Sequence, residues 1–130
     1  MSNEMKDGNA IERNELNDVR IFRQNEILVE EGESDGGWFI LLSGKIGVKK
    51  KGIQIAEYSE KGTILGELSV ILQKPRTATL QALEETEVLC IHKSLDELIK
   101  NYPDVAKKIM VNIAERLAQT TEDLLTAIKK

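Results

Sequence analysis

Residues 62–82 read GTILGELSVILQKPRTATLQA, and the predictions of fold and of function both start from this stretch. Its middle part, residues 66–72 (GELSVIL), has the composition of one short helix that follows glycines, which let the backbone turn tightly. The start of a helix offers unpaired N–H groups that attract an anion. Pro75 then interrupts the apolar segment and is followed by Arg76. If the chain folds back at Pro75, the Arg76 guanidinium can reach the start of the helix.

Two charged residues bracket the short apolar segment, Glu67 at its start and Arg76 just past its end. Arginine forms forked hydrogen bonds with two oxygens of one phosphate, and Thr77 adds a hydroxyl donor beside it. A carboxylate near a phosphate needs a partner of its own, and a sugar hydroxyl would donate to Glu67. The pattern therefore predicts a site for a compact nucleotide with one negative charge. The alternative is a surface ion pair in a loop, which contributes only about 0–1 kcal/mol.

Short apolar segments on both sides of this stretch predict β-strands. They are residues 19–33 with a turn at Asn25, residues 38–42 as a strand buried on both faces, a hairpin over 48–59 that turns near Lys51-Gly52, and strands over 77–83 and 87–91. Short strands at close spacing with glycine turns are typical of a small sandwich or barrel. Trp38 and Phe39 are expected in its core rather than in a base-stacking role.

The spacing of apolar residues changes to a helical period after residue 93. Ser94 with Glu97 three residues later is a capping-box pattern that predicts a helix start. A long helix is expected over about 104–128 after Pro103, with apolar residues at three- and four-residue steps. That apolar face predicts either packing on the strands or a seam with a second copy of the chain. Residues 1–17 are polar and predict a loose tail or a short helix.

The composition limits the number of domains, the kind of partner and the location that can be expected. A chain of 130 residues favours one domain, and its net charge of −4 does not suggest a nucleic-acid partner. The run Lys49–Lys51 is interpreted as a solvated hairpin tip. No segment has the length of a membrane span or the pattern of a signal peptide, and the single Cys90 in an apolar segment is expected to be a buried small hydrophobe. A cytoplasmic location without a membrane partner is therefore expected.

Enzyme motifs are absent from the sequence. It contains no Walker A loop, no G-x-G-x-x-G, no H-E-x-x-H and no C-x-x-C. His92 is the only histidine, so a metal site is not expected, and neither is a metal-dependent jelly-roll enzyme. No catalytic residue and no cofactor are predicted.

Residues 62–82, together with VRIFRQNEILVEEGE (19–33) and WFILLSGKIGV (38–48), resemble the cyclic nucleotide-binding domain family, and residues 62–82 resemble its phosphate-binding cassette. That family includes catabolite-activator-type regulators, kinase regulatory subunits and cyclic-nucleotide-gated channels. The resemblance implies a mainly β fold with flanking helices. It would be an antiparallel β-roll, or jelly roll, over about 18–93, with a short phosphate-binding helix and C-terminal helices over about 94–128.

The resemblance also implies roles for individual residues. Glu67 would accept the ribose 2′-hydroxyl, and Arg76 would pair with the exocyclic oxygens of the cyclic phosphate. In the family, a threonine at the place of Thr77 can contact a guanine base, so cyclic GMP is a candidate ligand beside cyclic AMP. Asn25 and Leu65 depart from residues common in the family, glycine and phenylalanine. The remaining implied site residues are Leu65 and Leu68 as apolar walls, Gly66 as the turn, the N–H groups of Leu68, Ser69 and Ala78, and Arg116, Leu124 and Leu125 as a lid on the long helix.

These observations favour a non-catalytic regulatory module that binds cyclic AMP or cyclic GMP and passes the signal through its C-terminal helix to an effector protein or a second copy of the chain. Two alternatives remain. The chain could be a protein-interaction module that no longer uses a nucleotide. It could also be the sensor half of a transcription regulator whose DNA-binding part lies outside this sequence.

Overall fold

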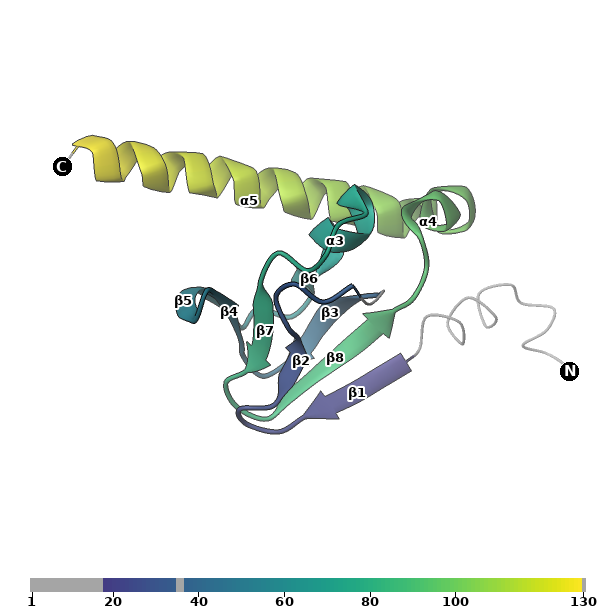
Figure 1. Cartoon of the computed structure of the whole chain (residues 1–130). Coiled ribbons are helices and arrows are strands. Elements are labelled where there is room, and N and C mark those ends of the chain that lie inside the picture. The colour runs from purple at the N-terminus through teal and green to yellow at the C-terminus, as the bar shows by residue number, and fades with distance from the viewer. Residues whose placement is uncertain (1–17, 35–36, 130) are drawn as a thin grey trace, which may run out of the picture. The chain divides into compact units, whose positions relative to one another are not determined.

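The computed structural model of the chain describes residues 18–34 and 37–129 (Figure 1). The prediction of a tail or short helix over residues 1–17 lies outside the described residues. The chain divides into two compact units, with the boundary between Lys93 and Ser94. Among the described residues, the first unit contains the strands and one short helix, and the second contains two helices.

The first unit is built from two four-stranded sheets whose recorded strand pairs are all antiparallel. One sheet has the order β1-β8-β3-β6 and the other has the order β2-β7-β4-β5. This arrangement confirms the mainly β class and the antiparallel β-roll. The strands are β1 (Asp18–Phe22), β2 (Ile27–Val29), β3 (Trp38–Ser43), β4 (Ile46–Lys50), β5 (Ile53–Tyr58), β6 (Ile64–Leu65), β7 (Thr79–Ala82) and β8 (Thr86–Ile91).

Apolar side chains from both sheets form the core of this unit. Burying each such side chain contributes roughly 1.5–3 kcal/mol. Trp38 and Phe39 are adjacent in β3 and both are buried, which confirms the prediction of a core strand buried on both faces. Cys90 is also buried, as expected for a small hydrophobe. The core cluster consists of Val29, Phe39, Leu41, Ile46, Leu65, Leu80, Val88 and Cys90.

Two tight turns lie where the sequence predicts them. Asn25 has a φ of 76° between β1 and β2, and Lys51 and Gly52 both have positive φ between β4 and β5. Two consecutive residues with positive φ are the signature of the hairpin turn that matches strand twist. The strand predicted over residues 77–83 is shorter, because β7 covers only Thr79–Ala82. The backbone of Arg76, just before it, instead pairs with the loop after β2.

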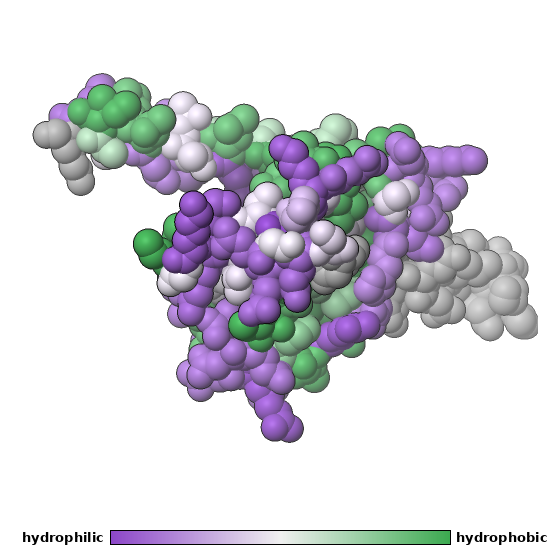
Figure 2. Space-filling model, viewed as in Figure 1, coloured by the Kyte–Doolittle hydropathy of each residue, from purple (hydrophilic) through white to green (hydrophobic). Residues whose placement is uncertain are grey.

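The second unit consists of α4 (Leu95–Asn101) and α5 (Pro103–Lys129). The predicted helix start at Ser94 is confirmed, because the Glu97 N–H donates to the Ser94 hydroxyl at 3.1 Å, which is one of the two bonds of a capping box. Ala106 and Ile109 near the start of α5 are buried, whereas the later apolar residues are not. Green, hydrophobic residues gather toward the C-terminal end of α5 in Figure 2. The exposed large apolar residues of this helix are Met110, Val111, Leu117, Leu124, Leu125 and Ile128.

None of the helices in the described part of the chain has the length and apolar character needed to cross a membrane.

Candidate functional site

The candidate site is the cassette, which we define as residues 64–79: β6, the helix α3 (Glu67–Leu72) and the segment that returns to β7. Gly66 links β6 to α3 with a φ of 81°. A Cβ atom at this position would lie 3.2 Å from Arg76 Nη1 and 3.3 Å from Phe39 Cδ2. Glycine is therefore required here twice, for the left-handed backbone and for the close approach of two side chains.

The return segment fixes the position of Arg76. Helix α3 ends at Gln73, whose φ is 54° and whose N–H donates to the Ser69 carbonyl. The Arg76 N–H then donates to the Glu33 carbonyl at 2.7 Å, and the Gly32 N–H donates to the Arg76 carbonyl at 2.8 Å. These two backbone bonds anchor the returning chain to the loop after β2. The predicted reversal around Pro75 is therefore present.

The Arg76 guanidinium reaches the start of α3. Its Nη1 donates to the Gly66 carbonyl and to the Ser69 hydroxyl, each at 2.8 Å. Its Nη2 donates to the carbonyl of Gly37, which immediately precedes β3. The Arg76 residue is only 3% exposed. The start of α3 and the residue before β3, which lies 39 positions from Arg76 in the sequence, thus meet at one buried cation.

Glu67 lies in the first turn of α3 and is 2% exposed. A carboxylate is favoured in the first turn, where the helix presents unpaired N–H groups. Gly66, the residue before Glu67, accepts a hydrogen bond from Arg76 through its carbonyl. The Arg76 guanidinium therefore lies at the same end of α3 as Glu67. The surface ion pair considered as the alternative is wrong, because both residues are buried. Buried charges are costly unless they have partners, and such clusters occur preferentially at functional sites.

The other predicted site residues lie in different environments. Leu65 is part of the core and pairs with Phe39 across β6 and β3, whereas Leu68 is 43% exposed. Thr77 and Ala78 are half-buried in the return segment. The Lys50 Nζ donates to the Thr77 carbonyl at 2.7 Å and so ties the return segment to β4.

The predicted lid residues Arg116, Leu124 and Leu125 lie on α5, in the second unit, where Leu124 and Leu125 are exposed. Their role as a lid, and the proposed ligand contacts of the N–H groups of Leu68, Ser69 and Ala78, remain predictions.

Sequence reasoning missed the residues that hold Arg76 from outside the cassette. Gly37 supplies a carbonyl, Phe39 packs against Gly66, and residues 32–33 pair with the Arg76 backbone. They precede Arg76 by 37–44 positions, so no local spacing pattern could indicate them. The hydroxyl of Ser69 was missed as well, because only its N–H group was considered.

Two further chemistries, metal binding and thiol nucleophilicity, are not supported by the described residues. Within residues 18–34 and 37–129, no cluster of three or more histidine, cysteine, aspartate or glutamate residues could hold a metal ion. Burial raises the pKa of the Cys90 thiol, which keeps it neutral and poorly nucleophilic.

Comparison with known proteins shows what the chain is similar to. The profile of the cyclic nucleotide-binding domain matches residues 19–102. A lysophospholipase, nte1 of Neurospora crassa, is 28% identical over 103 residues, which are 75% of this chain and 7% of the relative. The cGMP-dependent protein kinase egl-4 of Caenorhabditis briggsae is 24% identical over 110 residues, which are 82% of this chain and 15% of the kinase.

A solved structure described as "Sp-2Cl-cAMPS bound to PKAR CBD2" is 26% identical and has a TM-score of 0.63. The match covers 93% of this chain and 80% of that one. The chain thus spans a small part of these curated relatives but most of this single solved domain.

Proposed function

Because the chain belongs to the cyclic nucleotide-binding domain family, we propose that it is a regulatory module that binds cyclic AMP or cyclic GMP through its cassette. One observation carries this proposal above the others. The buried Arg76 guanidinium is held against the Gly66 carbonyl, at the end of α3 where the buried Glu67 also lies. A cation for a phosphate and an acceptor for a ribose hydroxyl would then be available at the same end of this helix.

Each side chain has a proposed task in binding. Arg76 would pair with the exocyclic oxygens of the cyclic phosphate, and the N–H groups of Leu68, Ser69 and Ala78 would donate to the same group. Glu67 would accept a hydrogen bond from the ribose 2′-hydroxyl. Leu65 and Leu68 would supply apolar contacts to the sugar. The phosphate carries the charge, so its contact with Arg76 would contribute most to the affinity.

Binding would change the contacts within the cassette. Nη1 of Arg76 is bonded to two protein acceptors, the Gly66 carbonyl and the Ser69 hydroxyl. A phosphate oxygen that took over this donor would release them and allow α3 to shift. A ligand can only favour a conformation that it binds more tightly, so this exchange is a physical source of differential affinity. We propose that the shift selects a position of α5, with Arg116, Leu124 and Leu125 forming the lid.

The output of the module is a proposed interaction rather than a reaction. We propose that the chain has no catalytic activity of its own and that a partner reads the position of α5. That partner would be an effector protein or a second copy of the chain bound along the exposed apolar residues of α5, which include Leu117 and Leu124. We propose the cytoplasm as the compartment, since the lone Cys90 is buried and provides no disulfide framework.

The same exposed face of α5 favours a second candidate function, a protein-interaction module that no longer uses a nucleotide. A sensor half of a transcription regulator remains a further alternative. A ligand-binding measurement distinguishes the nucleotide-independent interaction module from the main proposal, because only the main proposal predicts that a cyclic nucleotide binds. The buried Arg76 and Glu67 support the main proposal, because buried charged groups at one helix end occur preferentially at functional sites.

Calorimetric titration of the whole chain with cyclic AMP and with cyclic GMP tests the proposed function. We expect saturable binding of at least one of them, with one ligand per chain. AMP, which has an open phosphate, is the matched control and should bind more weakly. The absence of heat with both cyclic nucleotides up to millimolar concentration would reject the proposal.

The role of Glu67 is tested by pairing a variant with a matched ligand. Glu67→Gln should weaken cyclic AMP binding about tenfold, because a hydrogen bond to a charged group is worth roughly 1.5–3 kcal/mol. Wild-type chain should lose a similar factor with 2′-deoxy-cyclic AMP, which lacks the hydroxyl. When the Glu67→Gln variant is titrated with 2′-deoxy-cyclic AMP, the two losses should not add, because each change removes the same hydrogen bond. Additive losses would show that Glu67 does not bind the 2′-hydroxyl.

The preference for a base is tested at Thr77. Thr77→Ala should reduce cyclic GMP affinity by about three- to tenfold, because a neutral hydrogen bond is worth roughly 0.5–1.5 kcal/mol. The same substitution should change the affinity for cyclic AMP less than twofold. Thr79→Ala is the matched control, since the Thr79 hydroxyl accepts the Glu31 N–H at 2.9 Å and is already occupied in the fold. Equal losses for both nucleotides would exclude Thr77 as the guanine contact.

A further inference from the structure

A cavity separate from the cassette lies inside the first unit. Its volume is about 150 Å³. An apolar cavity of this volume can stay dry and admit a molecule as large as benzene. The residues that line it are Arg20, Phe22, Leu28, Val29, Gly37, Trp38, Phe39, Cys90 and His92. No residue of the cassette is among them, so the cavity is not the proposed nucleotide site, although Gly37 and Phe39 contact Arg76 and Gly66 of the cassette as well.

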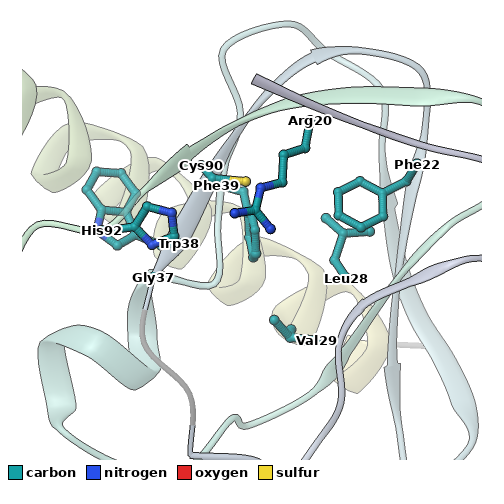
Figure 3. A pocket seen from close by; sticks show the side chains of 9 residues that line it. All are labelled: Arg20, Phe22, Leu28, Val29, Gly37, Trp38, Phe39, Cys90 and His92. Carbon is teal, nitrogen blue, oxygen red and sulfur yellow. The ribbon is translucent and has the colours of Figure 1, made fainter. Parts of the chain in front are cut away.

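The body of the cavity suits an apolar group. Its lining includes the aromatic rings of Phe22, Trp38 and Phe39 and the aliphatic side chains of Leu28 and Val29. Burial raises the pKa of the Cys90 thiol, so this residue contributes no charge at neutral pH. Figure 3 shows the Arg20 side chain reaching over the cavity, with Phe22 and Leu28 on one side and Trp38 and His92 on the other.

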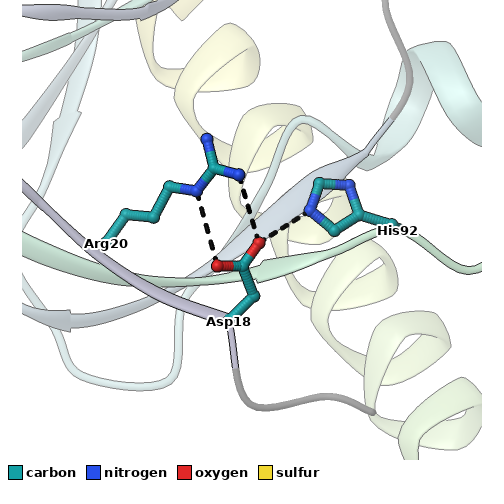
Figure 4. A network of polar contacts seen from close by, with 3 residues as sticks. All are labelled: Asp18, Arg20 and His92. Atoms are coloured by element: carbon teal, nitrogen blue, oxygen red, sulfur yellow. Dashed lines mark hydrogen bonds and ion pairs between the residues drawn. The ribbon is translucent and has the colours of Figure 1, made fainter.

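Arg20 belongs to a small polar network on β1 and at the end of β8 (Figure 4). Its Nε and Nη2 donate to the Asp18 carboxylate at 3.5 and 3.3 Å, and His92 Nε2 lies 2.9 Å from the same carboxylate. The hydrogen bond with His92, followed by that with Arg20, lowers the pKa of Asp18 and keeps it ionised at neutral pH. These contacts orient the exposed Arg20 side chain but hold it only weakly.

The Asp18 contacts leave Arg20 able to bind another anion. Both hydrogen bonds exceed the roughly 2.7–2.9 Å of a strong charge-assisted bond. Among residues 18–34 and 37–129, no hydrogen-bond acceptor is recorded for Nη1 of Arg20. A guanidinium with an uncommitted edge therefore stands over a cavity of ring size whose body is formed by aromatic and aliphatic side chains.

We propose that this cavity is a second ligand site, which takes a small carboxylate with an apolar body about the size of one ring. The ring would fill the space between Phe22, Leu28 and Phe39, and the carboxylate would accept from Nη1 of Arg20. A neutral molecule of the same size would fit the body but would gain nothing from the cation. A larger or doubly charged ligand would exceed the volume or place a second charge against Asp18.

Benzoate is the probe, and toluene is its neutral counterpart of similar size. Trp38 is the only tryptophan in the sequence and lines the cavity, so its indole NMR signal reports occupancy directly. We expect benzoate to shift this signal saturably at millimolar concentration. Arg20→Gln should weaken benzoate binding about three- to tenfold and leave toluene binding unchanged. Arg23→Gln, at an exposed arginine outside the cavity, is the matched control and should have no effect.

A second variant tests the body of the site independently of the charge. Leu28→Phe adds volume at a half-buried wall and should weaken benzoate and toluene alike. Saturating cyclic AMP should leave benzoate bound, because none of the residues proposed to contact the nucleotide lines the cavity. Absence of a saturable shift, equal effects of the Arg20 and Arg23 variants, or displacement of benzoate by cyclic AMP would each overturn the proposal. The Arg20 comparison stands even if the Leu28 variant does not fold.

Discussion

Replacing Arg76 with alanine is expected to reduce cyclic AMP affinity at least about tenfold, and by up to a hundredfold, because the phosphate loses its only proposed cationic partner. Hydrogen bonds to charged groups are worth roughly 1.5–3 kcal/mol each, and a guanidinium can form two with one phosphate. Arg76→Lys should recover only part of the loss, since an ammonium keeps the charge but cannot form the forked pair. Calorimetric titration of the three proteins measures these differences.

The same substitution should destabilise the fold, and this effect must be measured separately. Without the guanidinium, the carbonyls of Gly66 and Gly37 and the hydroxyl of Ser69 lose a donor. Buried polar groups left unsatisfied cost about 1–3 kcal/mol each, so we expect a loss of roughly 2–4 kcal/mol after partial relaxation. Urea unfolding without ligand gives this value.

Binding is then compared at a temperature where each variant remains folded. Arg23→Ala, at an exposed position in the turn after β1, serves as the control for removal of one positive charge. Wild-type affinity in a folded Arg76→Ala protein would contradict the assigned role.

Gly66→Ala should have the second large effect, on stability and on binding together. The residue has a φ of 81°, where a non-glycine residue costs about 1–2 kcal/mol. The added Cβ would also lie 3.2 Å from Arg76 Nη1 and 3.3 Å from Phe39 Cδ2, so both neighbours must move. We expect a loss of roughly 2–4 kcal/mol in the free energy of unfolding, together with weaker cyclic AMP binding, since the displaced atom is the proposed phosphate ligand.

Gly62→Ala is a closely matched control for this substitution. Gly62 has a φ of 95°, but a Cβ added there has no atom within 4 Å. It should therefore cost only the backbone strain, about 1–2 kcal/mol, and leave cyclic AMP affinity unchanged. Denaturant unfolding and titration of both variants separate strain from crowding. If the two variants lost equal stability and equal affinity, the close packing of Gly66 against Arg76 would have no functional role.

The elements that sequence reasoning predicted well are those determined by nearby residues. The turns at Asn25 and Lys51-Gly52 follow from residues that tolerate positive φ, and the helix cap at Ser94 follows from its spacing to Glu97. Helix α3 and the reversal around Pro75 follow from the composition of fourteen consecutive residues, 66–79. In each case the physical cause lies within a few positions of the observed feature.

The elements that it missed depend on contacts between distant segments. The start of β7 at Thr79 rather than residue 77 reflects the pairing of Arg76 with residues 32–33, which no local pattern reveals. The same holds for the Gly37 carbonyl that binds the guanidinium and for the cavity under Arg20. Burial of Glu67 and Arg76 also could not be read from their spacing, which an exposed ion pair would satisfy equally well.

The central claim, that a cyclic phosphate binds at the Arg76 guanidinium, is tested most directly by the phosphorus-31 NMR signal of cyclic AMP with the protein in excess. Wild-type protein should shift this signal from its free position, because the phosphate leaves water for a buried cation. Arg76→Ala should return the signal to the free position at the same concentrations, whereas Arg23→Ala should not. A wild-type signal that stays at the free position, or a full shift that persists in Arg76→Ala, would contradict the account.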